Sequence, residues 1–297
     1  MRFTGAYTAL ATPFSDGDID EEAYRQFIEW QISEGIDGLV PCGSTGESAT
    51  MSHEEHAKVI RICVDQAKKR VPVIAGAGSN NTAEAIHLTR IAREAGADAA
   101  LLITPYYNKP TQDGLFAHYR KIADEVPEMP LIVYNVPGRT GVCINPATMA
   151  RMFREIPSVT GMKEATADMT YVSEVLELCG PDLNLLSGDD FTVLPTLMLG
   201  GEGVISVTSN IAPRKMATLC AACAGGNLTR ARKLHYELNP LNRACFVESN
   251  PIPVKTALAV MGKMKADLRL PLVQPSPENQ NLIRRTLEAM GLAQKQQ

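Results

Sequence analysis

Eight short apolar runs follow one another along this chain, and a stretch with helical periodicity comes after each of them. The runs are rich in Val, Ile, Leu and Ala, and they cover residues 7–14, 38–44, 72–79, 99–107, 130–137, 159–165, 183–190 and 203–210. Strands that are apolar along most of their length are typical of a parallel sheet covered by helices. The repeat therefore predicts eight successive strand-then-helix units.

The connecting stretches carry the signals of capped helices. The stretches 21–35 and 82–96 both end on a glycine, and Ser52 with Glu55 forms a capping box ahead of the stretch 53–69. Eight units at intervals of about 20–35 residues favour a closed (β/α)8 TIM barrel, which usually takes ~250 residues. The rival is an open doubly wound sheet, but that fold normally has fewer units and a GxGxxG turn after its first strand.

The pattern changes after residue 225, where Gly225-Gly226 closes a helix and no further strand follows. Three helical stretches come next, and the last begins with Ser276-Pro277, a good N-cap and first-turn proline. We expect a barrel with the active site over residues 1–225 and a C-terminal helical domain over 226–297. The boundary between them has no Gly/Ser-rich linker, so two independently mobile domains are not expected.

Composition narrows the function classes. The 29 basic and 33 acidic residues give a net charge of −4, which provides no basic field for nucleic acid or anionic lipid. The N-terminus lacks the pattern of a signal peptide, and no apolar run approaches ~18 residues. The seven cysteines suggest no disulfide framework, so a cytoplasmic location is expected. We interpret the CxxC pair Cys220 and Cys223 as small core residues.

The active site of such a barrel forms at the C-terminal ends of its strands. After the second strand, the turn Gly43-Ser44-Thr45-Gly46-Glu47 can direct backbone N–H groups toward an anion, although a simple glycine turn explains it equally well. After the fifth strand, Tyr134 is a candidate general acid or base, and Arg139 offers a fork suited to a carboxylate. The alternative is that Tyr134 is a buried tyrosine whose hydroxyl is hydrogen-bonded, and that Arg139 is a surface arginine.

Lys163 lies inside an otherwise apolar sixth strand, where a charged lysine is unfavourable unless it is paired or neutral. Desolvation favours the neutral amine, which is the nucleophilic form. A salt bridge to Glu164 is the structural alternative. However, strand alternation directs Glu164 to the opposite face, toward the helices. That placement favours a functional lysine.

Two further strand ends carry polar or aromatic residues. Tyr106 and Tyr107 follow the fourth strand, where exposed tyrosines more often mark an interface, and Lys109 is expected to be a solvated loop charge. Asp189 and Asp190 follow the seventh strand and could hold a metal. A helix N-cap for the stretch that begins at residue 191 is the favoured use.

Six segments carry a resemblance to a known family. In order, GSTGES, ITPYYNKP, YNVPGRTG, GMKEA, LSGDD and GVISVTSN resemble the pyruvate-dependent class I aldolases of the N-acetylneuraminate lyase superfamily. Within it, they are most similar to the branch that condenses pyruvate with L-aspartate 4-semialdehyde in lysine and diaminopimelate biosynthesis. The match covers nearly the whole chain, and the joint occurrence of the segments at successive strand ends is highly specific. The family uses no cofactor and no metal.

The resemblance implies a catalytic set. Lys163 attacks the pyruvate carbonyl and forms an imine, whose enamine is the carbon nucleophile. Tyr134 passes protons at the imine-forming step and is linked through Thr45 to Tyr107. In the family, this last tyrosine reaches the site of a neighbouring subunit, and the assembly is a homotetramer built as a dimer of dimers.

The resemblance also implies a substrate-binding set. The backbone amides of Ser44 and Thr45 hold the pyruvate carboxylate, and Arg139 binds the carboxylate of aspartate semialdehyde. Gly188 and Ile205 line the pocket through their main chains. Ser44 stands where the family often has threonine, which keeps the hydroxyl group.

A second set resembles the L-lysine inhibition site of feedback-regulated members. It comprises Ser48, Ala49, His53, His56, Asn80, Glu84 and Tyr106. A capped helix with two solvent-facing histidines is the plain alternative, and HEEH lacks the i,i+4 spacing of a zinc motif. We expect that this set binds lysine.

Three rival functions remain open at this point. An N-acetylneuraminate or 2-keto-3-deoxy sugar acid lyase would share Lys163 and Tyr134, but these lyases generally lack an arginine at the position of Arg139. A pyridoxal-phosphate barrel would need a phosphate-cradling loop, and no convincing one is found. A non-catalytic barrel that binds a keto acid or amino acid would need neither the lysine nor the tyrosine.

Overall fold

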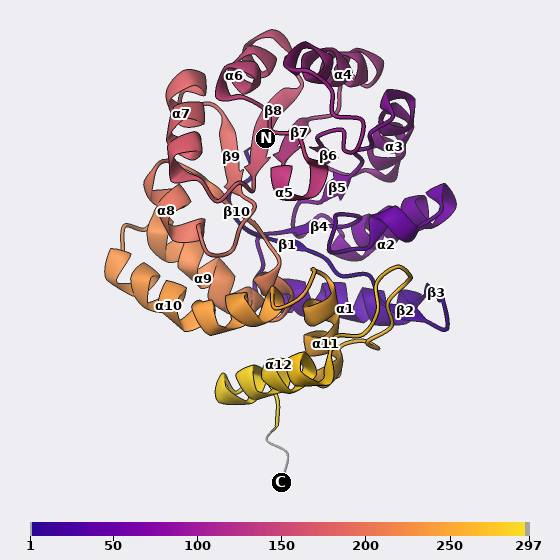
Figure 1. Cartoon of the computed structure of the whole chain (residues 1–297), viewed down its shortest axis with the longest axis vertical. Helices are drawn as coiled ribbons and strands as arrows, with labels where there is room; N and C mark the ends of the chain where they lie inside the picture. The colour runs from indigo at the N-terminus through magenta and orange to yellow at the C-terminus, as the bar shows by residue number, and fades with distance from the viewer. Residues whose placement is uncertain (1, 295–297) are drawn as a thin grey trace.

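The computed structural model describes residues 2–294 and has eight parallel strands that close into a barrel (Figure 1). The sheet order is β4-β1-β10-β9-β8-β7-β6-β5, and an isolated parallel bridge between Leu39 and Val73 joins the two outer strands. The strands are β1 (Gly5–Ala9), β4 (Gly38–Val40), β5 (Ile74–Gly76), β6 (Ala99–Ile103), β7 (Leu131–Asn135), β8 (Val159–Glu164), β9 (Asn184–Ser187) and β10 (Gly203–Ser206). All eight predicted strands are present, and the (β/α)8 prediction is confirmed.

The helices form a ring around the strands, with α5 drawn over the middle of the barrel (Figure 1). Each strand-to-helix step follows the predicted alternation. The ring comprises α1 (Glu21–Ser33), α2 (His53–Ala67), α3 (Thr82–Ala95), α4 (Gln112–Glu125), α6 (Pro146–Glu155), α7 (Met169–Cys179), α8 (Val193–Met198) and α9 (Pro213–Ala224). The short helix α5 (Pro137–Thr140) and the 3-10 turns η1 (Ser48–Thr50) and η2 (Thr208–Asn210) lie in the connections.

Strand alternation divides the core into two clusters. Inside the barrel, Tyr7, Ile132 and Leu186 belong to a small buried cluster. On the outer face, residues such as Val133 and Met162 join the larger cluster between sheet and helices. Successive side chains of a strand point to opposite faces, so the apolar runs fill both layers at once.

Most of the predicted helix ends are found. Ser52 accepts a hydrogen bond from the Glu55 amide, and Glu55 accepts one from the Ser52 amide, so the capping box is complete. Gly96 ends α3 with φ of +85°, a conformation that favours glycine. Ser276 caps α12, and Pro277 is its first residue.

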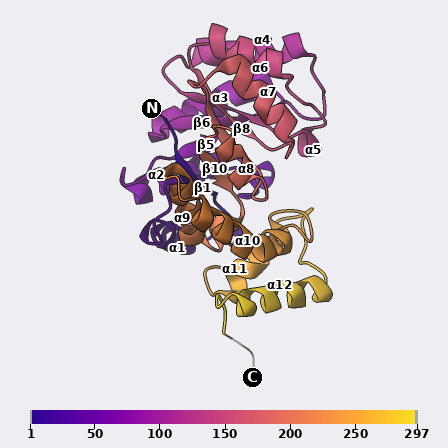
Figure 2. The same ribbon diagram turned by 90° about the vertical axis from the view of Figure 1, so that its left-hand side faces the viewer.

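The chain after residue 225 is helical, with α10 (Leu228–Cys245), α11 (Ile252–Val260) and α12 (Pro277–Ala289). Figure 2 shows α11 and α12 below the barrel, while α10 runs beside α9. A small hairpin of β2 (Phe14–Ser15) and β3 (Asp18–Ile19), which was not predicted, follows β1. The domain boundary at residue 225 stays a prediction.

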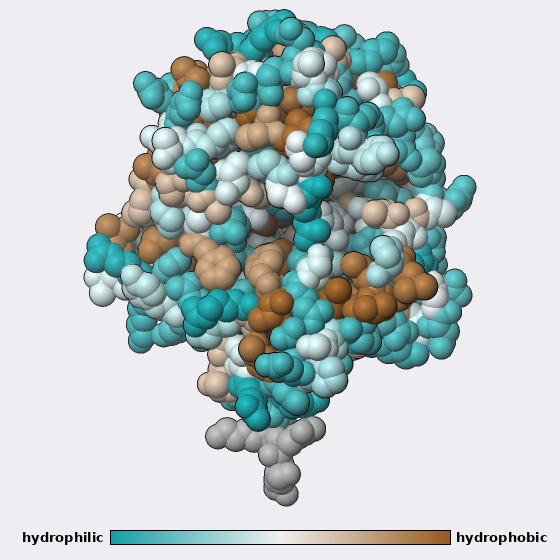
Figure 3. All heavy atoms as spheres, in the orientation of Figure 1, coloured by the Kyte–Doolittle hydropathy of each residue, from teal (hydrophilic) through white to brown (hydrophobic). Residues whose placement is uncertain are grey.

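The visible face of the molecule is mixed in polarity. Figure 3 shows mostly polar side chains, with apolar groups gathered in separate patches. Within residues 2–294, none of the helices combines the length and the apolar character that a membrane span requires. All seven cysteines are free thiols, with Cys220 buried and Cys223 partly buried, as expected for core residues.

Candidate active site

Lys163 lies in the barrel interior, where β8 places it beside β7. It is only 5% exposed and is paired in register with Tyr134. The Lys163 Nζ lies 4.2 Å from the centroid of the Tyr134 ring. Among the described residues, no carboxylate forms an ion pair with this ammonium. The buried amine therefore faces an aromatic ring rather than an acid, which is the environment predicted for a nucleophilic lysine.

Glu164 lies on the opposite face of β8, as predicted. Its Oε1 accepts a hydrogen bond from the Thr166 amide at 2.7 Å, and the residue is buried. Burial raises the pKa of this carboxyl to about 7, although the hydrogen bonds from Thr166 and Asn135 oppose the shift. Glu164 therefore does not neutralise Lys163.

A cavity of about 130 Å³ opens at the C-terminal ends of the strands, above Lys163. It brings together six of the predicted residues: Ser44, Thr45, Tyr134, Arg139, Lys163 and Gly188. The remaining wall is Ala9, Val40, Gly43, Leu101, Val136, Ala165, Asp189, Val207, Phe246 and Asn250. Side chains from separate strand ends and the C-terminal segment thus converge on one small space.

The turn after β4 is held from both sides. The Gly46 amide donates to the Gly43 carbonyl at 3.1 Å, and the Thr12 hydroxyl donates to the Gly46 carbonyl at 2.8 Å. Within residues 2–294, the backbone N–H groups of Ser44 and Thr45 have no acceptor. Free N–H groups in a fixed turn are suited to bind an anion, which agrees with the predicted carboxylate role.

Arg139 belongs to the single-turn helix α5 rather than to an open Pro-Gly turn. It is exposed, and its Nη2 donates to the main-chain carbonyl of Asn250 at 3.2 Å. This contact directs the guanidinium to the edge of the cavity. The remaining N–H groups of the fork can bind a carboxylate bidentately.

Gly188 leaves no room for a side chain. A Cβ there would lie 2.7 Å from Ala165 Cβ and 3.0 Å from Lys163 Cε, so the glycine permits the lysine position. Ile205 is fully buried in the interior cluster and is not among the residues that line the cavity. Its predicted main-chain contact with a substrate stays a prediction.

The two predicted tyrosines after β6 lie outside this cavity. Tyr107 is 89% exposed with φ of +70°, and Tyr106 is 37% exposed. Thr45 is buried, and among the described residues no hydrogen bond joins it to Tyr134 or Tyr107. The proton relay that the resemblance implies therefore stays a prediction. Lys109 is exposed, as expected for a loop charge.

Asp189 and Asp190, which follow β9, have different hydrogen-bond partners. The predicted use as a helix N-cap is therefore only partly right. Asp189 Oδ1 accepts from the amides of Phe191 and Thr192, both at 3.0 Å, just ahead of α8. Asp190 is buried and accepts from the amides of Val207 and Thr208 at 3.0 Å. It ties this loop to the end of β10. No group of three or more His, Cys, Asp or Glu suited to a metal occurs in residues 2–294.

A second cavity, of about 400 Å³, adjoins the first. Six of the seven residues expected to bind lysine line it: Ser48, Ala49, His53, His56, Glu84 and Tyr106. The seventh, Asn80, holds the wall by donating to the Tyr106 carbonyl at 3.2 Å. The two cavities share Ser44, Arg139 and Asn250.

The histidines of this second cavity differ from the plain alternative of two solvent-facing side chains. His56 is 6% exposed, its Nε2 lies 2.7 Å from the Gly76 carbonyl, and burial lowers its pKa. His53 is exposed and lies 2.7 Å from Glu84 Oε1. Hydrogen bonds from Ser79 and His53 lower the pKa of Glu84. The wall therefore carries a carboxylate that stays ionised and a neutral buried histidine.

Sequence reasoning missed the contribution of the C-terminal segment. The Lys255 ammonium, fully buried in α11, lies 2.6 Å from Glu47 Oε1, and the Arg269 amide donates to Glu47 Oε2 at 3.0 Å. Asn250 donates from Nδ2 to Thr45 Oγ1 at 2.9 Å. The signal for Lys255 was present, because it is a lysine in the apolar run Ile252–Val260, as Lys163 is in its strand.

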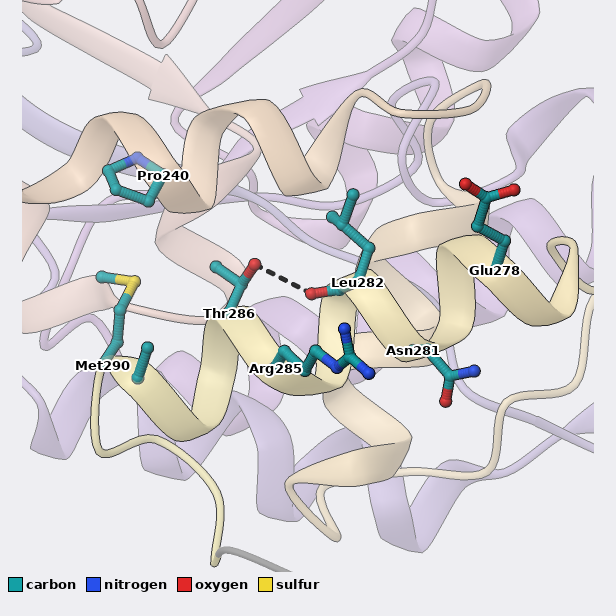
Figure 4. A pocket seen from close by; sticks show the side chains of 8 residues that line it. Pro240, Glu278, Asn281, Leu282, Arg285, Thr286 and Met290 are labelled. Carbon is teal, nitrogen blue, oxygen red and sulfur yellow. Dashed lines mark hydrogen bonds between the residues drawn. The ribbon is translucent and has the colours of Figure 1, made fainter.

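Another depression, of about 800 Å³, lies between α10 and α12 and contains none of the predicted residues (Figure 4). In Figure 4 the Thr286 hydroxyl bonds back to the Leu282 carbonyl in the same helix, at 2.9 Å. This surface has no convergent polar set comparable to that around Lys163.

Comparisons with known proteins agree with this site. The Dihydrodipicolinate synthetase family matches residues 2–290. The chain is 63% identical over 292 residues to a 4-hydroxy-tetrahydrodipicolinate synthase of Nitratidesulfovibrio vulgaris, covering 98% of this chain and 100% of that one. Two similar structures are the chloride-inhibited Acinetobacter baumannii dihydrodipicolinate synthase with pyruvate (TM-score 0.95, 44% identity, covering 98% and 99%) and the Cyanidioschyzon merolae enzyme with lysine bound (TM-score 0.95, 35% identity, covering 98% and 99%).

Proposed function

The chain belongs to the dihydrodipicolinate synthetase family, and on that premise we propose that it condenses pyruvate with L-aspartate 4-semialdehyde to give 4-hydroxy-tetrahydrodipicolinate. The observation that carries the proposal is Lys163. It is buried without an acid partner, faces the Tyr134 ring, and lies beneath a cavity at the C-terminal strand ends. Such a lysine is suited to Schiff-base chemistry.

Lys163 carries the reaction. Its neutral amine attacks the pyruvate carbonyl carbon, water is lost, and the imine nitrogen then withdraws electrons from the adjacent methyl group. Loss of a methyl proton gives the enamine, whose carbon attacks the aldehyde, and the aldehyde oxygen takes up a proton. The amino group of the second substrate then displaces Lys163 from the imine carbon, which closes the ring and frees the lysine. Tyr134 moves protons at the imine-forming step in this proposal, and its ring centroid lies 4.2 Å from Lys163 Nζ.

Two separate anchors hold the two carboxylates. The free amides of Ser44 and Thr45 suit the pyruvate carboxylate, and the Arg139 fork suits the carboxylate of the second substrate. Holding both reactants on one rigid barrel makes the condensation effectively unimolecular. A cavity of about 130 Å³ suits a three-carbon acid.

The rival functions are not favoured. If the chain were a sugar-acid lyase, the position of Arg139 at the cavity edge would have no functional explanation. A sensor barrel needs neither the buried Lys163 nor Tyr134 above it.

The second cavity is the site of feedback inhibition by L-lysine. The ionised Glu84 suits an ammonium group, and the surrounding polar wall of Ser48, His53 and Tyr106 suits the rest of an amino acid. Lysine is the end product of the synthesis that this reaction serves, so inhibition there would limit flux.

The working enzyme is a cytoplasmic homotetramer, a dimer of dimers. Support comes from Tyr107, which is too exposed for a tyrosine that serves its own cavity. An interface with a neighbouring subunit would cover it and bring it to that subunit's site.

The test is turnover of pyruvate and aspartate semialdehyde, followed through a coupled reductase, together with borohydride trapping of the pyruvate imine. Lys163→Ala should abolish both turnover and the added mass. Lys233→Ala is the matched control, since its side chain is 77% exposed on α10. Arg139→Ala should raise KM for the aldehyde and leave trapping intact. A folded wild type that traps pyruvate but ignores this aldehyde would point to the sugar-acid lyases.

Lysine inhibition is tested by titrating lysine into the same assay. Glu84→Gln should raise the concentration for half inhibition on the order of tenfold, because a charged partner of the ligand is lost. Glu128→Gln, 70% exposed on the surface, is the control. Unchanged inhibition in Glu84→Gln would remove this carboxylate from the site.

A further inference from the structure

Asn250 connects two groups that come from opposite sides of the active-site cavity. It precedes α11 in the C-terminal segment and is 6% exposed. Its Nδ2 donates to Thr45 Oγ1 at 2.9 Å, and its main-chain carbonyl accepts from Arg139 Nη2 at 3.2 Å. Thr45 follows β4 and Arg139 follows β7, so Asn250 fixes the relative position of the two proposed substrate anchors.

The direction of the bond to Thr45 has a chemical consequence. A hydroxyl that accepts a hydrogen bond from an amide N–H keeps its own proton for another acceptor. In the described part of the chain, Thr45 Oγ1 has no other hydrogen bond. The Thr45 proton is therefore available to the cavity, which Tyr134 also lines and in which we propose that pyruvate binds.

The other end of the Asn250 amide supports this reading. Its Oδ1 is buried and has no hydrogen-bond partner within residues 2–294. An unpaired buried acceptor is unfavourable, and such groups in native proteins call for a functional explanation. The side chain leaves one acceptor unsatisfied while it donates to Thr45.

We propose that Asn250 is a positioning residue for imine formation, which acts by donating to Thr45 and thereby directing the Thr45 hydroxyl proton into the cavity. The proposal rests on the proposed function. Within residues 2–294, the Asn250 side chain forms its one hydrogen bond with Thr45 and none with Lys163 or Tyr134, so it acts through Thr45 and not on the substrate. Its main chain holds Arg139 independently, and substitution of the side chain leaves that carbonyl in place.

The test is a double-mutant cycle on the rate of imine formation, measured by borohydride trapping at saturating pyruvate. Asn250→Ala should lower the rate about tenfold, the equivalent of one hydrogen bond at the upper end of the usual range. In a Thr45→Val background the same change should alter the rate less than about twofold, because the group it acts on is gone. An equal loss in both backgrounds, or a wild-type rate in Thr45→Val, would overturn the proposal.

Asn250→Asp separates hydrogen-bond direction from packing. Aspartate has nearly the same shape but can only accept from Thr45 when ionised. The rate at saturating pyruvate should fall as in Asn250→Ala, whereas repulsion of the pyruvate carboxylate would appear in KM. A wild-type rate in Asn250→Asp would overturn the proposal. If wild-type protein traps no pyruvate, the proposed function fails; if wild type and Asn250→Ala trap pyruvate equally fast, only the positioning role fails.

Discussion

Replacing Glu164 by glutamine should stabilise the folded chain at neutral and alkaline pH. The side chain is 2% exposed, and burial raises its pKa to about 7 from an ordinary value of 4.5. Below pH 4.5 both folded and unfolded chains hold the proton. Between pH 4.5 and about 7, the Glu164 carboxyl ionises in the unfolded chain but stays protonated in the folded chain. The free energy of unfolding therefore falls as the pH rises toward 7.

The size of the effect follows from the same two values. The difference between a pKa of 4.5 and one of about 7 corresponds to about 3 kcal/mol of unfolding free energy above pH 7. Glutamine resembles the protonated acid and keeps an oxygen to accept from the Thr166 amide, 2.7 Å away in the present structure. The variant should therefore match the wild type near pH 4 and exceed it by up to about 3 kcal/mol near pH 8.

Urea unfolding at several pH values measures this difference directly. Both proteins must be compared at one concentration, because subunit assembly contributes to apparent stability. Glu177→Gln, on the exposed face of α7, is the control and should leave the pH profile unchanged. Parallel curves for Glu164→Gln and wild type across pH 5–8 would refute the reasoning that this carboxyl stays protonated in the fold.

Three further outcomes are expected. Lys255→Met should lower the unfolding free energy by about 3–5 kcal/mol in urea, because it leaves Glu47 buried without its 2.6 Å partner. Gly188→Ala should slow borohydride trapping on Lys163 on the order of 100-fold, since its Cβ would collide with the lysine, whereas Gly138→Ala has open space and should react normally. A metal chelator should leave the turnover rate unchanged, because in the proposed reaction the imine nitrogen on Lys163 supplies the electron sink.

The barrel and the buried interior position of Lys163 could be predicted because they depend on local patterns. The eight apolar runs specify the strands, and the period of two places Lys163 inside and Glu164 outside. The position of the site at the C-terminal strand ends then follows from the fold class. These inferences need only the residues of one strand at a time.

The contribution of Asn250 could not be predicted in the same way. Its partner Thr45 is 205 residues away in sequence, and no periodicity links the two. The ion pair of Glu47 and Lys255 is separated by 208 residues. Tyr107 is 89% exposed in the single chain, and its proposed role at the site of a neighbouring subunit stays a prediction.

The shared wall between the two cavities removes the need for a long pathway of communication. Ser44, Arg139 and Asn250 line both spaces, so ligands in the two cavities would contact the same three residues. A ligand shifts an equilibrium only through differential contacts with the two states, and here those contacts would include groups that we propose to bind substrate. The coupling is also reciprocal. If lysine in the outer cavity weakens substrate binding, substrate in the inner cavity must weaken lysine binding by the same factor, through the same three residues.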